Sequence, residues 1–223
     1  MFDRDLMARC WADFPHIRCP LCNGPLKNVL AACPVCGRWW EHYGMTVPSG
    51  PYIEAARILP TLVPLDAKSI LGVGAGDGFV AQPDWESRRM RIVGIDIMPS
   101  PGHEWVEKID ARDALSVFGP SSFDVVMACD MIEHVDKETG KRLLKDFSVI
   151  ARKMVLVTTP NGFTEQDPAL CPNEPWAWNP HQKHVCGWSV EEFRDAGYEV
   201  YANAINEAGG IESCYLLAVW RSK

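Results

Sequence analysis

The sequence predicts an α/β fold with a mostly parallel sheet, joined to a small N-terminal appendage. From about Tyr52 onward, short apolar runs alternate with amphipathic stretches, a pattern typical of β-α units. Before that point the chain contains paired cysteines and lacks this alternation. A length of 223 residues suits one main domain with a small addition.

The composition is that of a globular protein, with 47% hydrophobic and 23% charged residues. The 22 Lys and Arg against 29 Asp and Glu give a net charge of −7. This balance argues against binding nucleic acid through the charge of the whole chain and leaves a local basic patch open. No apolar run approaches the roughly 20 residues that span a bilayer, and the acidic N-terminus is unlike a signal peptide. We expect a cytoplasmic protein that does not bind membranes.

Residues 1–50 are predicted to form a zinc ribbon. Cys19 and Cys22 make one CxxC pair, Cys33 and Cys36 make a second, and ten residues separate the pairs. Because no export signal is apparent, a reducing compartment is expected, where paired cysteines indicate metal ligation rather than disulfides. Four thiolates suit a closed tetrahedral zinc site with a structural role.

Residues 47–51 contain two prolines and a glycine and are predicted to be a linker. The domain boundary is placed there, with the α/β domain over 51–223. Its seven expected strands are 69–73, 91–95, 105–109, 123–128, 154–158, 199–203 and 215–220. Its expected helices are 52–59, 78–82, 137–150 and 190–196, the last with a capping box of Ser189 and Glu192.

A glycine-rich turn with the sequence LGVGAGDG follows the first expected strand at residues 71–78. Glycines allow backbone amides to approach a ligand that a Cβ would block. The second expected strand ends in Asp96, about 20 residues after the glycines, where a carboxylate can accept hydrogen bonds from both ribose hydroxyls. The third ends at Asp110, where a carboxylate can meet an adenine amino group. These residues predict a nucleoside site at the carboxyl ends of the strands.

This order of glycines and acids resembles the class I S-adenosylmethionine-dependent methyltransferases. The resemblance implies a Rossmann-like seven-stranded sheet, S-adenosylmethionine as cofactor, and cofactor-binding residues Gly72, Gly74, Ala75, Gly76, Gly78, Asp96, Ile97, Asp110, Ala111 and Asp130. The glycines would line the methionine side, Asp96 would hold the ribose, and Asp110 with Ala111 would meet the adenine. Gly72 departs from the family, which usually has an acid there, and Asp77 is a candidate substitute.

The residues after the fourth expected strand bear on which kind of atom accepts the methyl group. A hydroxyl acceptor needs a base or a metal, whereas an amine or thiolate needs little else. Asp130, Glu133 and His134 are spaced i, i+3 and i+4, which places them on one face of a turn, and His184 arrives later in the chain.

The arrangement resembles the metal-dependent 2′-O-methyltransferases of small-RNA ends, which combine ExxEH with a later histidine. The resemblance implies a Mg, Mn or Zn ion at Asp130, Glu133, His134 and His184. In the alternative interpretation, Glu133, His134 and His184 shape the pocket or act as a base without a metal. The Glu133-His134 pair also resembles, more loosely, the Glu-His pair of the ubiquinone-pathway O-methyltransferases.

Residues 161–188 form a long connection rich in proline and aromatic residues. Such a connection indicates a lid or binding loop, and we expect it to cover the substrate. Trp176 and Trp178 either stack on a planar or cationic acceptor or pack the loop itself.

The expected activity is methyl transfer to oxygen or nitrogen of a small molecule. One alternative is an RNA methyltransferase, because the fragment Cys-Pro-Leu-Cys-x-x-Pro-Leu resembles the ribosomal-RNA guanine N1-methyltransferases, whose ribbon contacts RNA. With five basic and four acidic side chains, residues 1–50 offer a poor phosphate-binding surface. The other alternative is a binding module that has this fold and no catalytic activity.

Overall fold

The computed structural model describes residues 62–76, 90–100, 105–170, 172, 177–202 and 215–222. Most of them belong to a compact unit formed by Ala67–Tyr201 and Leu216–Lys223. The four cysteines of the predicted zinc ribbon, the linker and the helices expected at 52–59 and 78–82 lie outside the described residues. Those features remain predictions.

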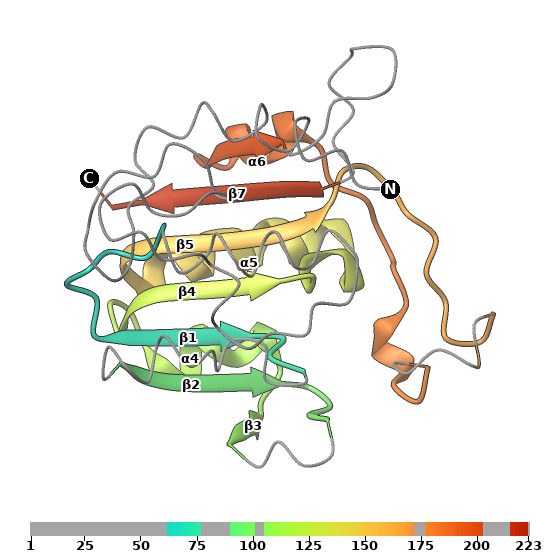
Figure 1. Cartoon of the computed structure of the whole chain (residues 1–223), viewed down its shortest axis with the longest axis horizontal. Coiled ribbons are helices and arrows are strands. Elements are labelled where there is room, and N and C mark those ends of the chain that lie inside the picture. The colour runs from blue at the N-terminus through green and yellow to red at the C-terminus, as the bar shows by residue number, and fades with distance from the viewer. Residues whose placement is uncertain are drawn as a thin grey trace, which may run out of the picture. The chain divides into compact units, whose positions relative to one another are not determined.

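The described unit is built on a seven-stranded sheet with the order β3-β2-β1-β4-β5-β7-β6 (Figure 1). The strands are β1 (Ser69–Val73), β2 (Arg91–Asp96), β3 (Val106–Lys108), β4 (Phe123–Cys129), β5 (Ala151–Pro160), β6 (Glu199–Ala202) and β7 (Tyr215–Arg221). Each lies where an apolar run predicted a strand, and β1 has the predicted bounds. The sequence therefore locates the whole sheet.

Strand β1 occupies the point where the strand order reverses. It pairs in parallel with β2 on one side and with β4 on the other, through Leu71 opposite Val93 and Val126. All five residues of β1 are buried, which explains its continuous apolar run. Strand β7 runs opposite to β5, so the sheet is mixed (Figure 1). In parallel α/β sheets, ligands bind outside the carboxyl ends of the strands at this switch point.

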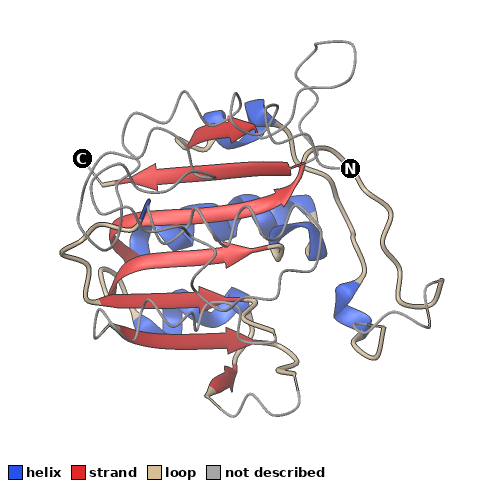
Figure 2. Ribbon diagram, viewed as in Figure 1, coloured by secondary structure: helices blue, strands red, loops and turns tan. Residues whose placement is uncertain are grey.

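Helices cover one face of the sheet (Figure 2). The longest is α5 (Lys137–Ile150), which Asp136 caps by accepting a hydrogen bond from the Thr139 amide. Helix α6 (Val190–Asp195) carries the predicted capping box of Ser189 and Glu192. Helix α4 (Ala114–Phe118) has only five residues and was not expected from the sequence. None of the described helices combines the length and the apolar character needed to cross a bilayer.

The described part of the chain also contains three 3-10 helices: η2 (Ala111–Asp113), η3 (Ile132–His134) and η4 (Pro180–Gln182). Each begins near the site described below. All three have three residues, which is too short for a helical period to show in the sequence.

A tightly packed aromatic side chain joins α5 to the chain that precedes α6. Trp188 is 1% exposed and lies against Gly140 of α5 so closely that a Cβ at residue 140 would collide with its ring. Its indole nitrogen donates a hydrogen bond to the Ile132 carbonyl at 3.3 Å. Gly140 therefore makes room for the indole ring.

We predict that Gly140→Ala destabilises the protein. In an exposed helix the same change gains about 1 kcal/mol, but here the methyl group overpacks the Trp188 site, which costs about 1–3 kcal/mol. Urea unfolding should show a lower free energy of unfolding than wild type. Arg142→Ala, on the exposed side of α5, is the control and should change stability little. Equal or greater stability of Gly140→Ala would contradict this packing.

Candidate functional site

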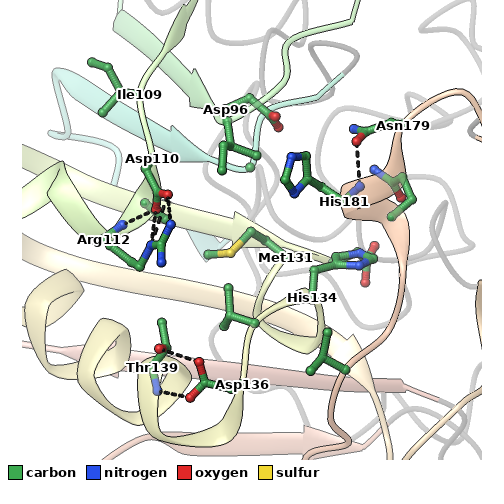
Figure 3. A pocket seen from close by; sticks show the side chains of 17 residues that line it. Asp96, Ile109, Asp110, Arg112, Met131, His134, Asp136, Thr139, Asn179 and His181 are labelled. Carbon is green, nitrogen blue, oxygen red and sulfur yellow. Dashed lines mark hydrogen bonds and ion pairs between the residues drawn. The ribbon is translucent and has the colours of Figure 1, made fainter.

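A cavity of about 370 Å³ opens at the carboxyl ends of β1, β2, β3 and β4 (Figure 3). Its sheet side is formed by Gly74, Asp96, Asp110 and Asp130, each of which follows or ends a different strand. Because these strands are parallel, residues far apart in the sequence meet at one edge. The cavity lies at the switch point between β1 and β4.

The turn after β1 is held in place by backbone hydrogen bonds. Gly74 has φ +66° and Gly76 has φ +46°, a left-handed conformation that favours glycine. The Ala75 amide donates to the Ile95 carbonyl at 3.0 Å, and a Cβ on Gly74 would collide with Met131 across the cavity wall. Glycine is thus required at residue 74 both by conformation and by space.

Asp96 receives two backbone hydrogen bonds in this structure. Its Oδ2 accepts from the Gly76 amide at 2.9 Å and its Oδ1 accepts from the Met98 amide at 2.7 Å. Each carboxylate oxygen can accept a second hydrogen bond. The amides orient the carboxylate, so that its remaining acceptor positions are available to hydroxyl groups in the cavity.

Asp110 is paired with Arg112 on η2. The guanidinium Nε donates to both carboxylate oxygens at 3.0 Å, and the Arg112 amide donates to Oδ1 at 2.9 Å. This side-chain pairing with Arg112 holds the pKa of Asp110 below its ordinary value. Asp110 is therefore ionised and largely satisfied by Arg112, a partner that the sequence did not reveal.

The chain turns sharply after β4. Asp130 has φ +49°, unusual for a residue other than glycine, and its amide donates to the Thr158 carbonyl at 3.0 Å. The turn directs Asp130 and Met131 to the cavity and leads into η3. Strained backbone of this kind is common at binding sites.

A second group of side chains meets beside the cavity. Glu133, His134 and His184 each offer a ligand atom within 4.8 Å of the others. Glu133 is 2% exposed and His184 is 8% exposed, whereas His134 reaches the cavity lining. Asp130, expected as a fourth member, is not part of this cluster and lines the cavity instead. The structure thus brings three of the four residues together, and the metal site itself stays a prediction.

Both histidines of the cluster are oriented by backbone carbonyl groups. His134 Nδ1 lies 3.0 Å from the Lys183 carbonyl oxygen, and His184 Nδ1 lies 2.6 Å from that of Thr164. A carbonyl only accepts, so in the neutral rings Nδ1 carries the proton and Nε2 the lone pair. This is the arrangement by which proteins prepare histidines as metal ligands.

Burial sets the protonation of the cluster. It lowers the pKa of His134 to about 4 and also lowers the pKa of His184. Burial, with the charge of Asp130 as a smaller cause, raises the pKa of Glu133 well above its ordinary value. Glu133 Oε2 accepts from the Thr159 hydroxyl at 3.0 Å, but Oε1 is buried with no hydrogen-bond partner in the described region.

His184 lies in the second of two chain segments, 161–170 and 177–188, which together we call the strap. Several contacts join them: the His184 amide donates to the Gln166 carbonyl at 2.9 Å, the Gln166 side-chain amide donates to the Gln182 carbonyl at 2.7 Å, and Lys183 pairs with Asp167 at 2.6 Å. The strap provides the other side of the cavity through Asn179, His181, Gln182 and Val185.

The strap is also fastened to η3. The Val185 and Cys186 amides both donate to the Glu133 carbonyl, at 2.8 and 3.2 Å. Lys137 donates to the Gly187 carbonyl and lies over the Trp188 ring, with Nζ 4.1 Å from its centroid. These contacts fix the position of the strap relative to η3 and to the cluster.

The predicted site residues separate into groups. Those lining the cavity are Gly74, Asp96, Ile97, Asp110, Ala111, Asp130 and His134. Gly72 and Ala75 are buried in and after β1, and Gly76 contributes its amide to Asp96. Glu133 and His184 lie in the cluster. Gly78, Asp77, Trp176 and Cys19, Cys22, Cys33 and Cys36 are outside the described residues.

Several lining residues were not assigned from the sequence, among them Met131, Val135, Asn179, His181 and Gln182. The sequence Asn-Pro-His at 179–181 is a turn-initiating signal, and the structure shows Asn179 Oδ1 accepting from the His181 amide at 2.9 Å. That signal locates the turn, but nothing local indicates that the turn faces a cavity.

Comparison with solved structures identifies the architecture. A SAM-dependent methyltransferase from Archaeoglobus fulgidus matches with a TM-score of 0.54 and 16% identity, over 77% of this chain and 92% of the other. The described chain has the class I SAM-dependent methyltransferase fold. Burkholderia thailandensis 1,6-didemethyltoxoflavin-N1-methyltransferase matches with a TM-score of 0.52 and 15% identity, over 77% and 78% of the two chains. The methyltransferase domain of bacterial CtHen1 matches with a TM-score of 0.48 and 18% identity, over 76% of this chain and 100% of the other.

No protein-family model and no curated protein matches the sequence. The class I fold inferred from the glycines and acids is confirmed by the structural matches. At 15 and 16% identity, the likeness to the first two of these structures shows the fold alone.

We predict that Glu133→Gln stabilises the metal-free protein at high pH. A raised folded-state pKa means that stability is fully present below the unfolded pKa near 4.5 and falls as pH rises through the folded pKa. Glutamine has no charge to bury. In EDTA, urea unfolding at pH 5 and pH 8 should therefore show a smaller loss of stability for Glu133→Gln than for wild type.

Glu138→Gln is the matched control, since Glu138 is 84% exposed in its ion pair with Lys141. Its pH dependence should follow that of wild type. A Glu133→Gln protein that loses as much stability as wild type between the two pH values would show that Glu133 ionises without penalty.

Proposed function

We propose that the protein is an S-adenosylmethionine-dependent methyltransferase that methylates a hydroxyl group of a small molecule, assisted by a divalent cation at Glu133, His134 and His184. The observation that carries the proposal is one cavity lined by the glycine turn, Asp96 and His134, with His134 also a member of the buried cluster beside the cavity.

The cofactor is assigned to the sheet side of the cavity. Gly74 leaves backbone exposed where a side chain would collide, and Asp96 presents oriented acceptors to a ribose. Ile97, Asp110 and Ala111 extend this wall toward an adenine. The acid missing at Gly72 leaves Asp130 as the carboxylate beside Gly74 on the methionine side.

The cluster fits a divalent cation. Two neutral imidazoles and a carboxylate are a suitable donor set for Mn or Zn, and a cation would satisfy the buried Glu133 Oε1, which lacks a hydrogen-bond partner among the described residues. Such an ion supplies Lewis acidity that lowers the pKa of a bound hydroxyl. The same charge would also draw Glu133 back to its ionised form.

The chain's own residues do the remaining work. The carbonyls of Lys183 and Thr164 keep the two Nε2 atoms unprotonated, and Thr159 orients Glu133. His134 lies between the cluster and the cavity, so an acceptor oxygen near it would face the methyl group of a cofactor on the sheet side. As the new carbon–oxygen bond forms, the sulfonium carbon–sulfur bond breaks and the hydroxyl proton leaves to solvent or to a base.

The charges of the cavity favour a small acceptor over RNA. Four aspartates line it, Asp96, Asp110, Asp130 and Asp136, and the single lining arginine, Arg112, is engaged by Asp110. An acidic surface of this kind attracts a sulfonium and repels phosphate groups. The zinc ribbon at Cys19, Cys22, Cys33 and Cys36 and the cytoplasmic location remain predictions.

The cofactor assignment predicts that Asp96→Ala weakens binding of S-adenosylhomocysteine at least tenfold. The substitution removes the acceptors proposed for the ribose, and each lost hydrogen bond to a charged group is worth about 1.5–3 kcal/mol. Isothermal titration of wild type and variant measures the change. Glu107→Ala, an exposed residue of neighbouring β3, is the control. If wild type takes up no S-adenosylhomocysteine, the methyltransferase proposal fails; binding without methyl transfer to any acceptor would favour a binding module.

The cation assignment predicts that His184→Ala loses Mn²⁺ binding by at least tenfold and leaves the affinity for S-adenosylhomocysteine within about twofold of wild type. Mn²⁺ is the probe because thiolates prefer softer ions, which keeps the cysteine pairs out of the measurement. Glu165→Ala, an exposed change on the strap, is the control. Unchanged Mn²⁺ affinity in His184→Ala, or full methylation activity in excess EDTA, would remove the metal from the proposal.

A further inference from the structure

The strap carries a second histidine that serves neither the cluster nor the protein core. We propose that His181 binds the nucleoside half of the cofactor from the strap side of the cavity; this inference rests on the proposed function. His181 lines the cavity. Figure 3 shows its imidazole between Asp96 and Met131, directed into the cavity, with Asp110 on the far side.

The position of His181 is set by the backbone rather than by chance side-chain packing. It is the middle residue of η4, and Asn179, which is 5% exposed, caps this turn by accepting from the His181 amide at 2.9 Å. The turn is closed by the Gln182 amide, which donates to the Asn179 carbonyl at 3.1 Å. Gln166 then ties Gln182 to the other segment of the strap at 2.7 Å.

The structure separates His181 from His184, although only two residues lie between them. His184 turns into the cluster with Glu133 and His134, whereas His181 is not a member of that cluster. In Figure 3 its imidazole instead points toward Asp96, the carboxylate proposed to hold the ribose. The imidazole therefore belongs to the nucleoside end of the cavity.

The chemistry of the two walls is complementary. On the sheet side, the ionised carboxylates of Asp96 and Asp110 can only accept hydrogen bonds. Both oxygens of Asp110 already accept from Arg112. A nucleoside also presents ribose oxygens and ring nitrogens that need donors. An imidazole supplies one N–H donor together with a planar ring, so His181 provides on the strap side what the two aspartates cannot.

The test is isothermal titration of the full chain with two probes, S-adenosylhomocysteine and adenosine. His181→Ala is expected to weaken both by about tenfold, the loss of roughly one buried hydrogen bond. Adenosine lacks the amino-acid half, so an equal loss for both probes assigns His181 to the nucleoside. Glu165→Ala, an exposed change on the same strap, is the control and should bind both probes as wild type does.

Wild-type affinity of His181→Ala for either probe would overturn the inference. Should His181→Ala fail to fold, shown by its circular dichroism spectrum, His181→Leu, which fills the space without an N–H donor, replaces it in the same titrations. The two proposals fail differently. If wild type binds neither probe, the proposed function is wrong; if wild type binds both and the His181 variants bind equally well, only the role of His181 is wrong.

Discussion

The parallel pairing of β1 with both of its neighbours is the constraint on which the site depends. Because β2 and β4 run alongside β1 in the same direction, their carboxyl ends meet at one edge of the sheet. Gly74, Asp96 and Asp130 come from three separate parts of the chain and line one cavity for this reason. The burial of all five residues of β1 holds this arrangement together, since a slipped strand would place the glycine turn away from Asp96.

The strap also positions the cluster, and it does so mainly through hydrogen bonds of backbone groups. The Glu133 carbonyl accepts from two strap amides, and the Lys183 carbonyl orients His134 in return. Each contact uses a main-chain atom, so the connection between strap and η3 does not depend on a particular pair of side chains. The same contacts present both imidazoles with Nδ1 occupied. The orientation of the two imidazoles thus results from backbone contacts within the strap and between the strap and η3.

The sheet side of the cavity and the buried cluster of Glu133, His134 and His184 differ in which protonation states their surroundings favour. On the sheet side of the cavity, backbone amides donate to Asp96, and pairing with Arg112 holds the pKa of Asp110 below its ordinary value. In the cluster, burial favours neutral histidines and a protonated Glu133. Without a positive ion this second arrangement is costly for Glu133, whose Oε1 has no hydrogen-bond partner in the described structure.

The sequence by itself determined the sheet, because an apolar run of five to seven residues is a local signal of a buried strand. It also located α5, the capping box of α6, and Gly74 and Asp96, whose roles follow from turn chemistry and spacing along adjacent strands. The five-residue helix α4 and η3 were too short to show a period. Only the tertiary structure decided that Arg112 engages Asp110, that Asp130 lines the cavity rather than joining the cluster, and that His181 and His184 face different ways. His134 and Lys183 are 49 residues apart and meet only because the strap folds back onto η3, and no pattern within a few residues of either one records that path.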